Sequence, residues 1–344
     1  LNLLSFFGAF YSCFGEKVLS VEQEIFLCWG NCKSHSKNDK DAKAIAVFVP
    51  GIIEDSPIYA KMVTGVKEAV EEFNIGKTKS KKVELVVFEA GTNQSEWFSQ
   101  ITSLAATQKY DVIFSSNPSL PELIKPLLTQ FPNQKFIFAD AFFEGSENMV
   151  TVSYKQGESA YLTGYIAGLM TKSNKIGLIS AQEYPIMNNE ILPEFKKGAN
   201  ASNLNVTVDF RIVGNWWDAK KGAELADAMN LNGVDVILPI CGGAVQGVIA
   251  SAKEHNFYLC GFDSNTYKSA PNLVISCVVN LQEKLCKELT LDYLNNKIQW
   301  GTAKSVGIKE GYIKFVDDDP LYIQTVPENV RNEIAAQINL FKGK

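Results

Sequence analysis

The feature that most constrains the fold of this chain is an internal repeat. Residues 234–265 have the pattern of a buried strand, a glycine pair, a helix and a second strand that ends near Asp263. The segment that starts at Tyr110 has the same order of strand, helix and strand, with Ser115, Ser116 and Asn117 where the glycine pair stands. It leads to Asp140, and the two aspartates are 123 residues apart. Strands that start at Lys82 and Asn205 have the same spacing. A repeat of this length predicts two similar α/β lobes.

The alternation of apolar strands with helical segments indicates mostly parallel sheets covered by helices. We therefore expect an α/β fold with two Rossmann-like lobes, joined by several crossovers that act as a hinge. The expected division is a leader and tether over residues 1–43, a first lobe over 44–155 and a second over 156–280. Residues 281–344 follow both lobes and are expected to contribute to each of them.

The composition excludes several classes of function. The net charge of −5 over 344 residues gives no sign of the basic surface that nucleic-acid binding needs. Only His35 and His255 are present, which argues against a zinc site built from histidines. The common phosphate-binding and hydrolase motifs are missing, and no residue stands out as a nucleophile or base. We expect a binding protein without metal or cofactor, not an enzyme.

Cysteines near the amino end suggest membrane attachment. Residues 1–14 are an apolar run of signal-peptide length, too short to span a bilayer. Cys13 follows this run as a lipidated cysteine would, and Cys32, which precedes a polar segment, is the alternative. A leader without lipid is the third possibility. The cysteines of apolar segments are expected to be buried free thiols: Cys241, Cys260, Cys277 and Cys286.

The small-residue segment QGESAYLTGYIAGLM at residues 156–170 contains three glycines and predicts a helix that packs closely against another. A membrane helix is the alternative, but the run is short and carries Glu158.

Candidate binding residues follow the carboxyl ends of the predicted strands, where ligands bind in open parallel sheets. Adjacent indoles in a loop suit stacking on a planar ligand, glycines allow close approach, and carboxylates accept hydrogen bonds from hydroxyls. For Asp55 and Asp140, a helix cap or a turn is the alternative, and Trp97 is expected in the core. The candidate residues are Asp55, Ile58, Tyr59, Asn117, Asp140, Trp216, Trp217, Gly242, Gly243 and Asp263.

From about Ala44 onward the chain resembles the basic membrane protein family, substrate-binding lipoproteins of ABC transporters that include a purine nucleoside receptor. The resemblance is carried by DSPIYAKMVTGV, QGESAYLTGYIAGL, GVDVILPICGGAVQGVI and the GFD of residues 261–263. It implies the type I periplasmic binding protein fold. It also implies that Asp263 binds ligand hydroxyls, that Gly242 and Gly243 line the cleft, and that aromatic residues from both lobes sandwich a base.

The chain departs from the nucleoside binders of that family at residues 55–59, where they have Asp-Lys-Ser-Phe-Asn. Ile58 stands in place of the stacking Phe and Tyr59 in place of the base-reading Asn. At the other stacking position the chain has Trp216 and Trp217, in a loop that is one residue shorter. These changes favour a larger, flatter ligand, and the chain is most similar to the riboflavin-binding lipoproteins of treponemes.

The resemblance thus implies a periplasmic protein, lipid-anchored to the bacterial cell membrane, that captures riboflavin for uptake. Its expected partners are the permease and ATPase subunits of an ABC transporter. A purine nucleoside is the alternative ligand, and an enzyme that acts on a nucleoside or flavin is a weaker alternative.

Overall fold

The computed structural model describes residues 42–343, and their strands form two six-stranded sheets. Neighbouring strands are parallel, except that the last strand of the second sheet is antiparallel to its neighbour. In spatial order, the first sheet contains β11 (Ala303–Val306), β5 (Met149–Tyr154), β4 (Lys135–Ala139), β3 (Val112–Ser116), β1 (Ala44–Val49) and β2 (Glu84–Glu89). The second contains β12 (Ile313–Phe315), β10 (Val274–Asn280), β9 (Tyr258–Asp263), β8 (Val236–Ile240), β6 (Lys175–Ser180) and β7 (Thr207–Ile212).

The strand orders of the two sheets are equivalent, strand for strand, which confirms the repeat and the two-lobed α/β fold predicted from it. One edge strand differs from the prediction. The sequence pattern after the second lobe indicates only one short β region, near residues 309–315, but β11 also forms and completes the first sheet. Two of the four β11 residues are exposed and polar, so the strand has no apolar alternation by which to recognise it.

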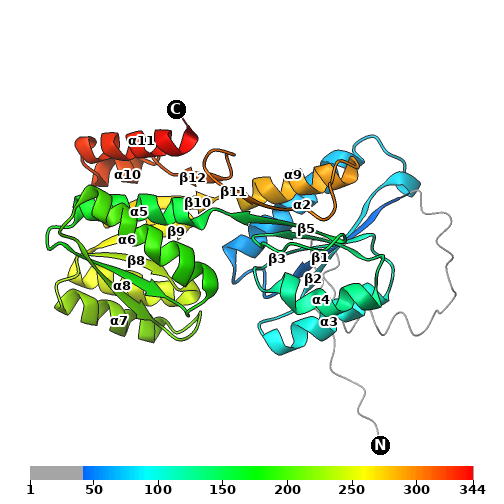
Figure 1. Ribbon diagram of the computed structural model, residues 1–344, viewed down its shortest axis with the longest axis horizontal. Helices are drawn as coiled ribbons and strands as arrows, with labels where there is room; N and C mark the ends of the chain where they lie inside the picture. Colours follow the sequence, from blue (N-terminus) through cyan, green and yellow to red (C-terminus); the bar gives the residue numbers. More distant parts are fainter. Residues whose placement is uncertain (1–41, 344) are drawn as a thin grey trace, which may run out of the picture.

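Helices cover both sheets and divide between the two lobes in Figure 1. The first lobe has α2 (Pro57–Asn74), α3 (Gln94–Ala106), α4 (Leu120–Gln130) and α9 (Gln282–Leu294). The second lobe has α5 (Gln156–Met170), α6 (Leu192–Ser202), α7 (Ala219–Leu231), α8 (Val245–His255), α10 (Pro320–Thr325) and α11 (Glu328–Lys342). A π-helical turn, Met187–Ile191, precedes α6. Trp97 is in the core, as predicted.

Helix α2 shows how local sequence fixes the start of an element that carries site residues. Ser56 is the N-cap, and its hydroxyl accepts a hydrogen bond from the Tyr59 N–H at 3.4 Å. Pro57 follows at the first helical position, where its missing N–H costs nothing. Ser56 therefore caps the helix, and Asp55, for which a cap was the alternative role, lies exposed in the preceding turn.

Glycines allow α5 and α6 to pack at very short range, as the small-residue pattern predicted. A Cβ on Gly164 would lie 2.0 Å from the carbonyl oxygen of Phe195, and a Cβ on Gly198 would lie 2.0 Å from that of Tyr161. Such distances are far below van der Waals contact, so only glycine fits at these two positions. No helix within residues 42–343 is long and apolar enough to cross a membrane.

Gly198→Ala is expected to destabilise the protein by about 1–3 kcal/mol, because the added methyl group overpacks the α5–α6 contact. Alanine favours helix by up to about 1 kcal/mol relative to glycine, so the sign of the change separates packing from helix propensity. The free energy of unfolding in urea measures it. Asn200→Ala, an exposed position of the same helix, is the control and should not destabilise.

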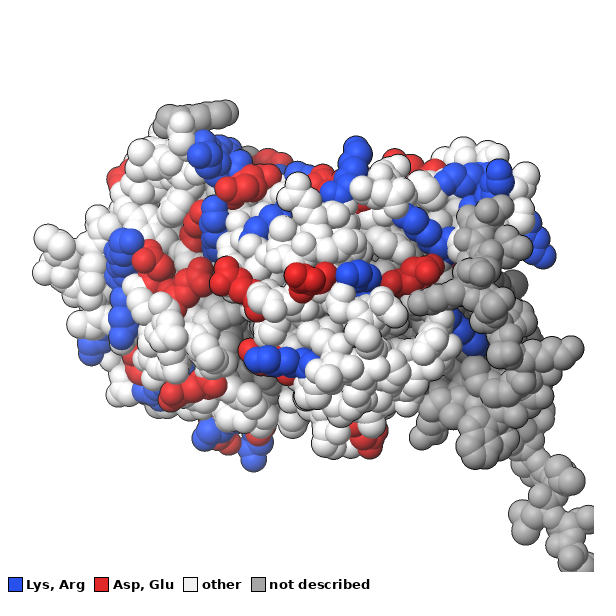
Figure 2. Space-filling view, turned by 45° about the vertical axis from the view of Figure 1, so that its right-hand side comes forward, with Lys and Arg blue, Asp and Glu red and all other residues white. Residues whose placement is uncertain are grey.

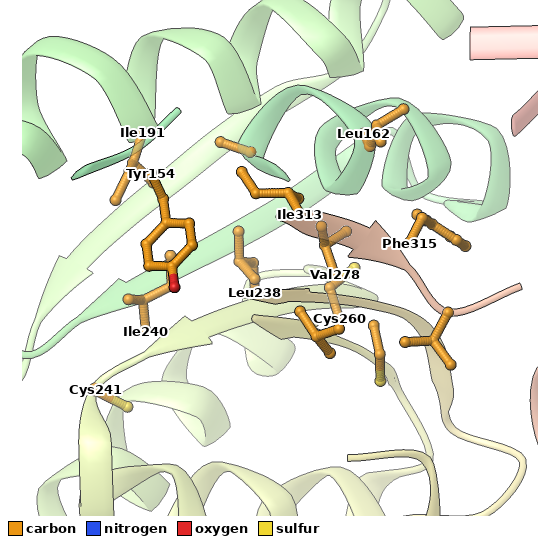
Figure 3. Close-up of a cluster of buried hydrophobic side chains, with 14 of the residues drawn as sticks. Tyr154, Leu162, Ile191, Leu238, Ile240, Cys241, Cys260, Val278, Ile313 and Phe315 are labelled. Carbon is orange, nitrogen blue, oxygen red and sulfur yellow. The ribbon is translucent and has the colours of Figure 1, made fainter. Parts of the chain in front are cut away.

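Three crossovers connect the lobes, at residues 154–156, 280–282 and 306–313. Side-chain hydrogen bonds join them: the Tyr154 hydroxyl donates to Gln282 Oε1 at 2.7 Å, and Gln282 Nε2 donates to Ser116 Oγ at 2.7 Å. Lys155 and Glu310 form an ion pair with an N–O distance of 3.0 Å. Figure 3 shows the Tyr154 ring beside residues of the second lobe, so this crossover packs into its core.

Candidate functional site

The carboxyl edges of the two sheets carry a pair of aspartates that influence each other across the lobes. Asp140 directly follows β4, and Asp263 ends the equivalent strand β9. Burial raises the pKa of Asp140 to about 7, and the charge on Asp263 contributes to the rise. Burial also raises the pKa of Asp263 to about 7, although the charge on Lys61 of α2 opposes it. The Asp263 carboxylate, from the second lobe, is therefore close enough to disfavour the ionisation of Asp140 in the first.

Both aspartates have a backbone conformation that is unusual for residues other than glycine. The φ angle is 52° at Asp140 and 61° at Asp263, in the left-handed region. Strain of this kind is often found at functional sites. Each carboxylate accepts one bond from a neutral amide: Asp140 from Gln156 Nε2 at 3.4 Å, and Asp263 from Asn280 Nδ2 at 2.7 Å. Neither bond supplies a positive charge.

The first-lobe candidates divide into two groups: Tyr59 and Asn117 lie beside Asp140, whereas Asp55 is exposed and Ile58 is half-buried at the start of α2. Asn117 Nδ2 donates to the Tyr59 hydroxyl at 3.3 Å. Burial raises the pKa of Tyr59, and the charge on Asp140 raises it further. Tyr59, Asn117 and Asp140 therefore lie together.

The two indoles lie in the loop between β7 and α7. Trp216 is 36% exposed and Trp217 is 72% exposed, so neither serves mainly as a core residue. Asn215 Oδ1 accepts the backbone N–H of Trp217 at 3.0 Å, and Asp218 caps α7. The loop is therefore held in place by its own polar side chains while the Trp217 indole stays accessible.

The glycine pair is explained in part by contact with that indole loop. Gly242 has a φ angle of 58°, and a Cβ on it would lie 2.7 Å from the Trp216 carbonyl oxygen. The Gly243 N–H donates to the same oxygen at 2.7 Å. The close backbone approach that the sequence suggested for a ligand is made here by the Trp216 loop, and the Gly243 N–H is already bonded.

Sequence reasoning missed Tyr184, which lies in the loop after β6. Its ring centroid is 6.0 Å from that of Trp216, with the ring planes at 44°. Burial raises the pKa of Tyr184, and the charges of Asp263 and Asp140 add to the rise. The signal was available, because Tyr184 follows the carboxyl end of a strand, as the other candidates do.

Two cavities, of about 160 and 180 Å³, lie at the amino ends of strands, away from the carboxyl ends that carry the candidate residues. The first includes Tyr110 and Gln134, and the second includes Asp235 and Tyr258. These residues precede or start their strands, and no candidate site residue lines either cavity.

The structure also bears on charge, metals and thiols. On the face shown in Figure 2, acidic and basic side chains are interspersed, with no broad basic area for a nucleic-acid backbone. Among the described residues, no group of three His, Cys, Asp or Glu side chains could hold a metal ion. The four cysteines of the apolar segments are buried and free, as predicted. Cys13 and Cys32 lie outside the described residues.

A model of the Bmp family, described as ABC transporter substrate-binding protein PnrA-like, matches residues 42–341. The chain belongs to this family. It is 26% identical to basic membrane protein A of Borreliella afzelii over 310 residues, which cover 88% of this chain and 90% of that protein. It is 24% identical to the ABC transporter nucleoside-binding protein BmpA of Lactococcus lactis subsp. cremoris over 341 residues, covering 91% and 92%.

Among solved structures, an ABC transporter solute-binding protein from Aeropyrum pernix superposes with a TM-score of 0.65 and 18% identity. The match covers 88% of this chain and 86% of that one, and at this identity it shows the fold alone. The chain is thus an ABC transporter substrate-binding protein of the Bmp family with the type I periplasmic binding protein fold. Membership in a family of transporter components is consistent with binding rather than catalysis.

Proposed function

We propose that this Bmp-family protein captures riboflavin between its lobes and delivers it to the permease and ATPase subunits of an ABC transporter. The observation that carries the proposal is the combination of exposed indoles with a pair of carboxylates at the facing sheet edges. Riboflavin has a flat three-ring system that suits stacking and a hydroxylated chain that suits carboxylates.

The accessible indole supports a planar ligand. Trp217 is 72% exposed. Contact of this apolar surface with water is unfavourable, and a ring stacked on the indole would remove it from water. In the proposed complex Trp216 and Trp217 wall the ring from the second lobe, and Tyr59 with Ile58 walls it from the first. Asp263 and Asp140 accept from the hydroxyl chain, and Asn117 and Asp55 supply further polar contacts. The proposed site also includes Gly242 and Gly243, which allow the indole loop to approach.

Binding would close the two lobes about the three crossovers. A ligand that touches both lobes only in the closed form favours that form by its difference in affinity for the two states.

We further propose an extracytoplasmic protein anchored by lipid at Cys13, with Cys32 as the alternative position. Metabolic labelling with a fatty acid, compared between Cys13→Ala and Cys32→Ala, identifies the lipidated residue.

A purine nucleoside is the second candidate ligand, favoured by the similarity to the nucleoside-binding protein of Lactococcus lactis. A nucleoside also joins a flat ring to hydroxyls, but its ring system is smaller than the surface that Trp216 and Trp217 offer for stacking. The departures at Ile58 and Tyr59 from the pattern of the nucleoside binders favour the larger flavin.

The visible absorbance spectrum of the purified protein, before and after denaturation, tests the ligand class, together with a titration of riboflavin fluorescence. Release of a flavin, or saturable quenching of added riboflavin, is the expected result. If the protein is colourless, quenches no riboflavin fluorescence and binds inosine, the ligand is a nucleoside and not riboflavin. Chromatography of the ligand after incubation reveals any product, which would show an enzyme.

A further inference from the structure

Tyr184 connects two parts of the site that the chain keeps apart. Its ring lies 6.0 Å from the ring of Trp216, measured between centroids. Asp263 and Asp140 are both near enough for their charges to affect its hydroxyl. One side chain therefore packs beside the Trp216 ring and lies within the electrostatic influence of both aspartates. No other tyrosine of the described residues has this combination of neighbours.

The surrounding backbone holds Tyr184 in this position. The Ala181 N–H donates to the Ile240 carbonyl oxygen at 3.0 Å, which ties the start of the loop to β8. At the other end, the Asn188 N–H donates to the Tyr184 carbonyl oxygen at 3.0 Å as the π-helical turn begins. The side chain is half-buried and packs against the core. Wide turns of this kind are frequent at functional sites.

The Tyr184 hydroxyl differs from those of the other two tyrosines near the aspartates. The Tyr154 hydroxyl donates to Gln282, and the Tyr59 hydroxyl accepts from Asn117. Within residues 42–343 no hydrogen bond joins the Tyr184 hydroxyl to another protein group. Its proton is therefore available to a ligand.

We propose that Tyr184 determines specificity for a ligand that joins a planar ring to a hydroxylated chain. Its ring holds Trp216 as a wall for the planar part, and its hydroxyl donates to a ligand hydroxyl that itself donates to Asp263 or Asp140. The inference rests on the proposed function and adds a residue and a role to that site.

The chemistry of hydroxyl groups supports this arrangement. A ligand hydroxyl both donates and accepts, whereas an ionised carboxylate only accepts. When a ligand hydroxyl donates a hydrogen bond to an aspartate, its oxygen can still accept one, and the nearby phenol supplies the donor. A buried ligand oxygen without a donor would lose part of its hydrogen bonding to water on binding.

The test compares Tyr184→Phe and Tyr184→Ala on two flavins by fluorescence quenching. Riboflavin carries the hydroxylated chain, and lumiflavin has the same ring with a methyl group in its place. Tyr184→Phe should weaken riboflavin binding by roughly 3- to 10-fold, the worth of one neutral hydrogen bond, and change lumiflavin binding by less than about twofold. Tyr184→Ala should weaken both, because Trp216 loses its packing partner. Tyr258→Phe, at the amino end of β9, is the matched control and should change neither.

Equal effects of Tyr184→Phe on the two flavins, or none on riboflavin, would overturn the inference while leaving the proposed function intact. Wild-type protein that binds neither flavin would instead contradict the proposed function. In that case the same variants are compared on inosine and hypoxanthine, which differ by the hydroxylated sugar, with the same expected pattern. Tryptophan emission of the ligand-free protein gives a further readout, since Tyr184→Ala but not Tyr184→Phe should shift it to longer wavelength.

Discussion

Replacement of Trp217 by alanine is expected to weaken riboflavin binding at least about tenfold. The indole is 72% exposed in the ligand-free protein, so a ring stacked on it would bury apolar surface from both partners. Burial contributes roughly 25 cal/mol per Å², and stacking adds about 0.5–1.5 kcal/mol. Burial of about 40 Å² of the indole, together with stacking, already exceeds the roughly 1.4 kcal/mol that corresponds to a tenfold change. Fluorescence titration with riboflavin measures the change.

Because Trp217 is exposed, removing its side chain leaves no cavity in the core, so a change in affinity reports on ligand contact and not on stability. Leu231→Ala is the matched control: this leucine is 87% exposed and lies at the far end of α7, the helix that follows the indole loop. It should bind riboflavin like the wild type. An affinity of Trp217→Ala within about twofold of the wild type would show that this indole does not stack on the ligand.

Asp140→Asn is expected to stabilise the ligand-free protein increasingly as the pH rises from about 4 to 7, with a constant gain above that. Burial, with the charge on Asp263, raises the pKa of Asp140 to about 7 from its ordinary value of 3.8. A raised carboxyl pKa means that the folded state holds a proton that the unfolded chain has lost. The stability provided by the neutral carboxyl is therefore present below pH 3.8 and lost by pH 7. Asparagine stays neutral and does not lose it.

The expected gain at pH 8 is on the order of 2 kcal/mol, since solvent around a partly exposed pair reduces the effect of the pKa change. Urea unfolding at pH 4, 6 and 8 measures it. Asp55→Asn, at an exposed position of the same sheet edge, is the control. Parallel pH profiles of the wild type and Asp140→Asn would show that Asp140 ionises as freely in the folded protein as in the unfolded chain.

The sequence was sufficient to predict the two lobes because their central strands are buried on both faces. Such strands are continuous apolar runs, as in AIAVFV of β1 and VISCVVN of β10, and the repeat sets their order. The edge strand β11 was not predicted because its two central residues are exposed and polar, and packing does not select apolar side chains there.

The site was predicted less completely, for a different reason. The rule that ligands bind at strand carboxyl ends located Asp140, Asp263 and the indoles. It does not tell which side chains from different loops meet, because contact depends on tertiary geometry. The approach of Tyr184 to Trp216, and that of the Trp216 backbone to Gly242, join residues that are far apart along the chain.

The positions of β11 and β12 have a consequence for the order in which the molecule can be completed. Each sheet receives its edge strand from a segment that follows both lobes. The first sheet lacks β11 until residue 306 is made, and the second lacks β12 until residue 315 is made. A growing chain therefore cannot finish one lobe before it starts the other. Synthesis from the amino end therefore leaves both sheets incomplete until nearly the whole polypeptide exists, so we expect the two lobes to complete their folding together and late.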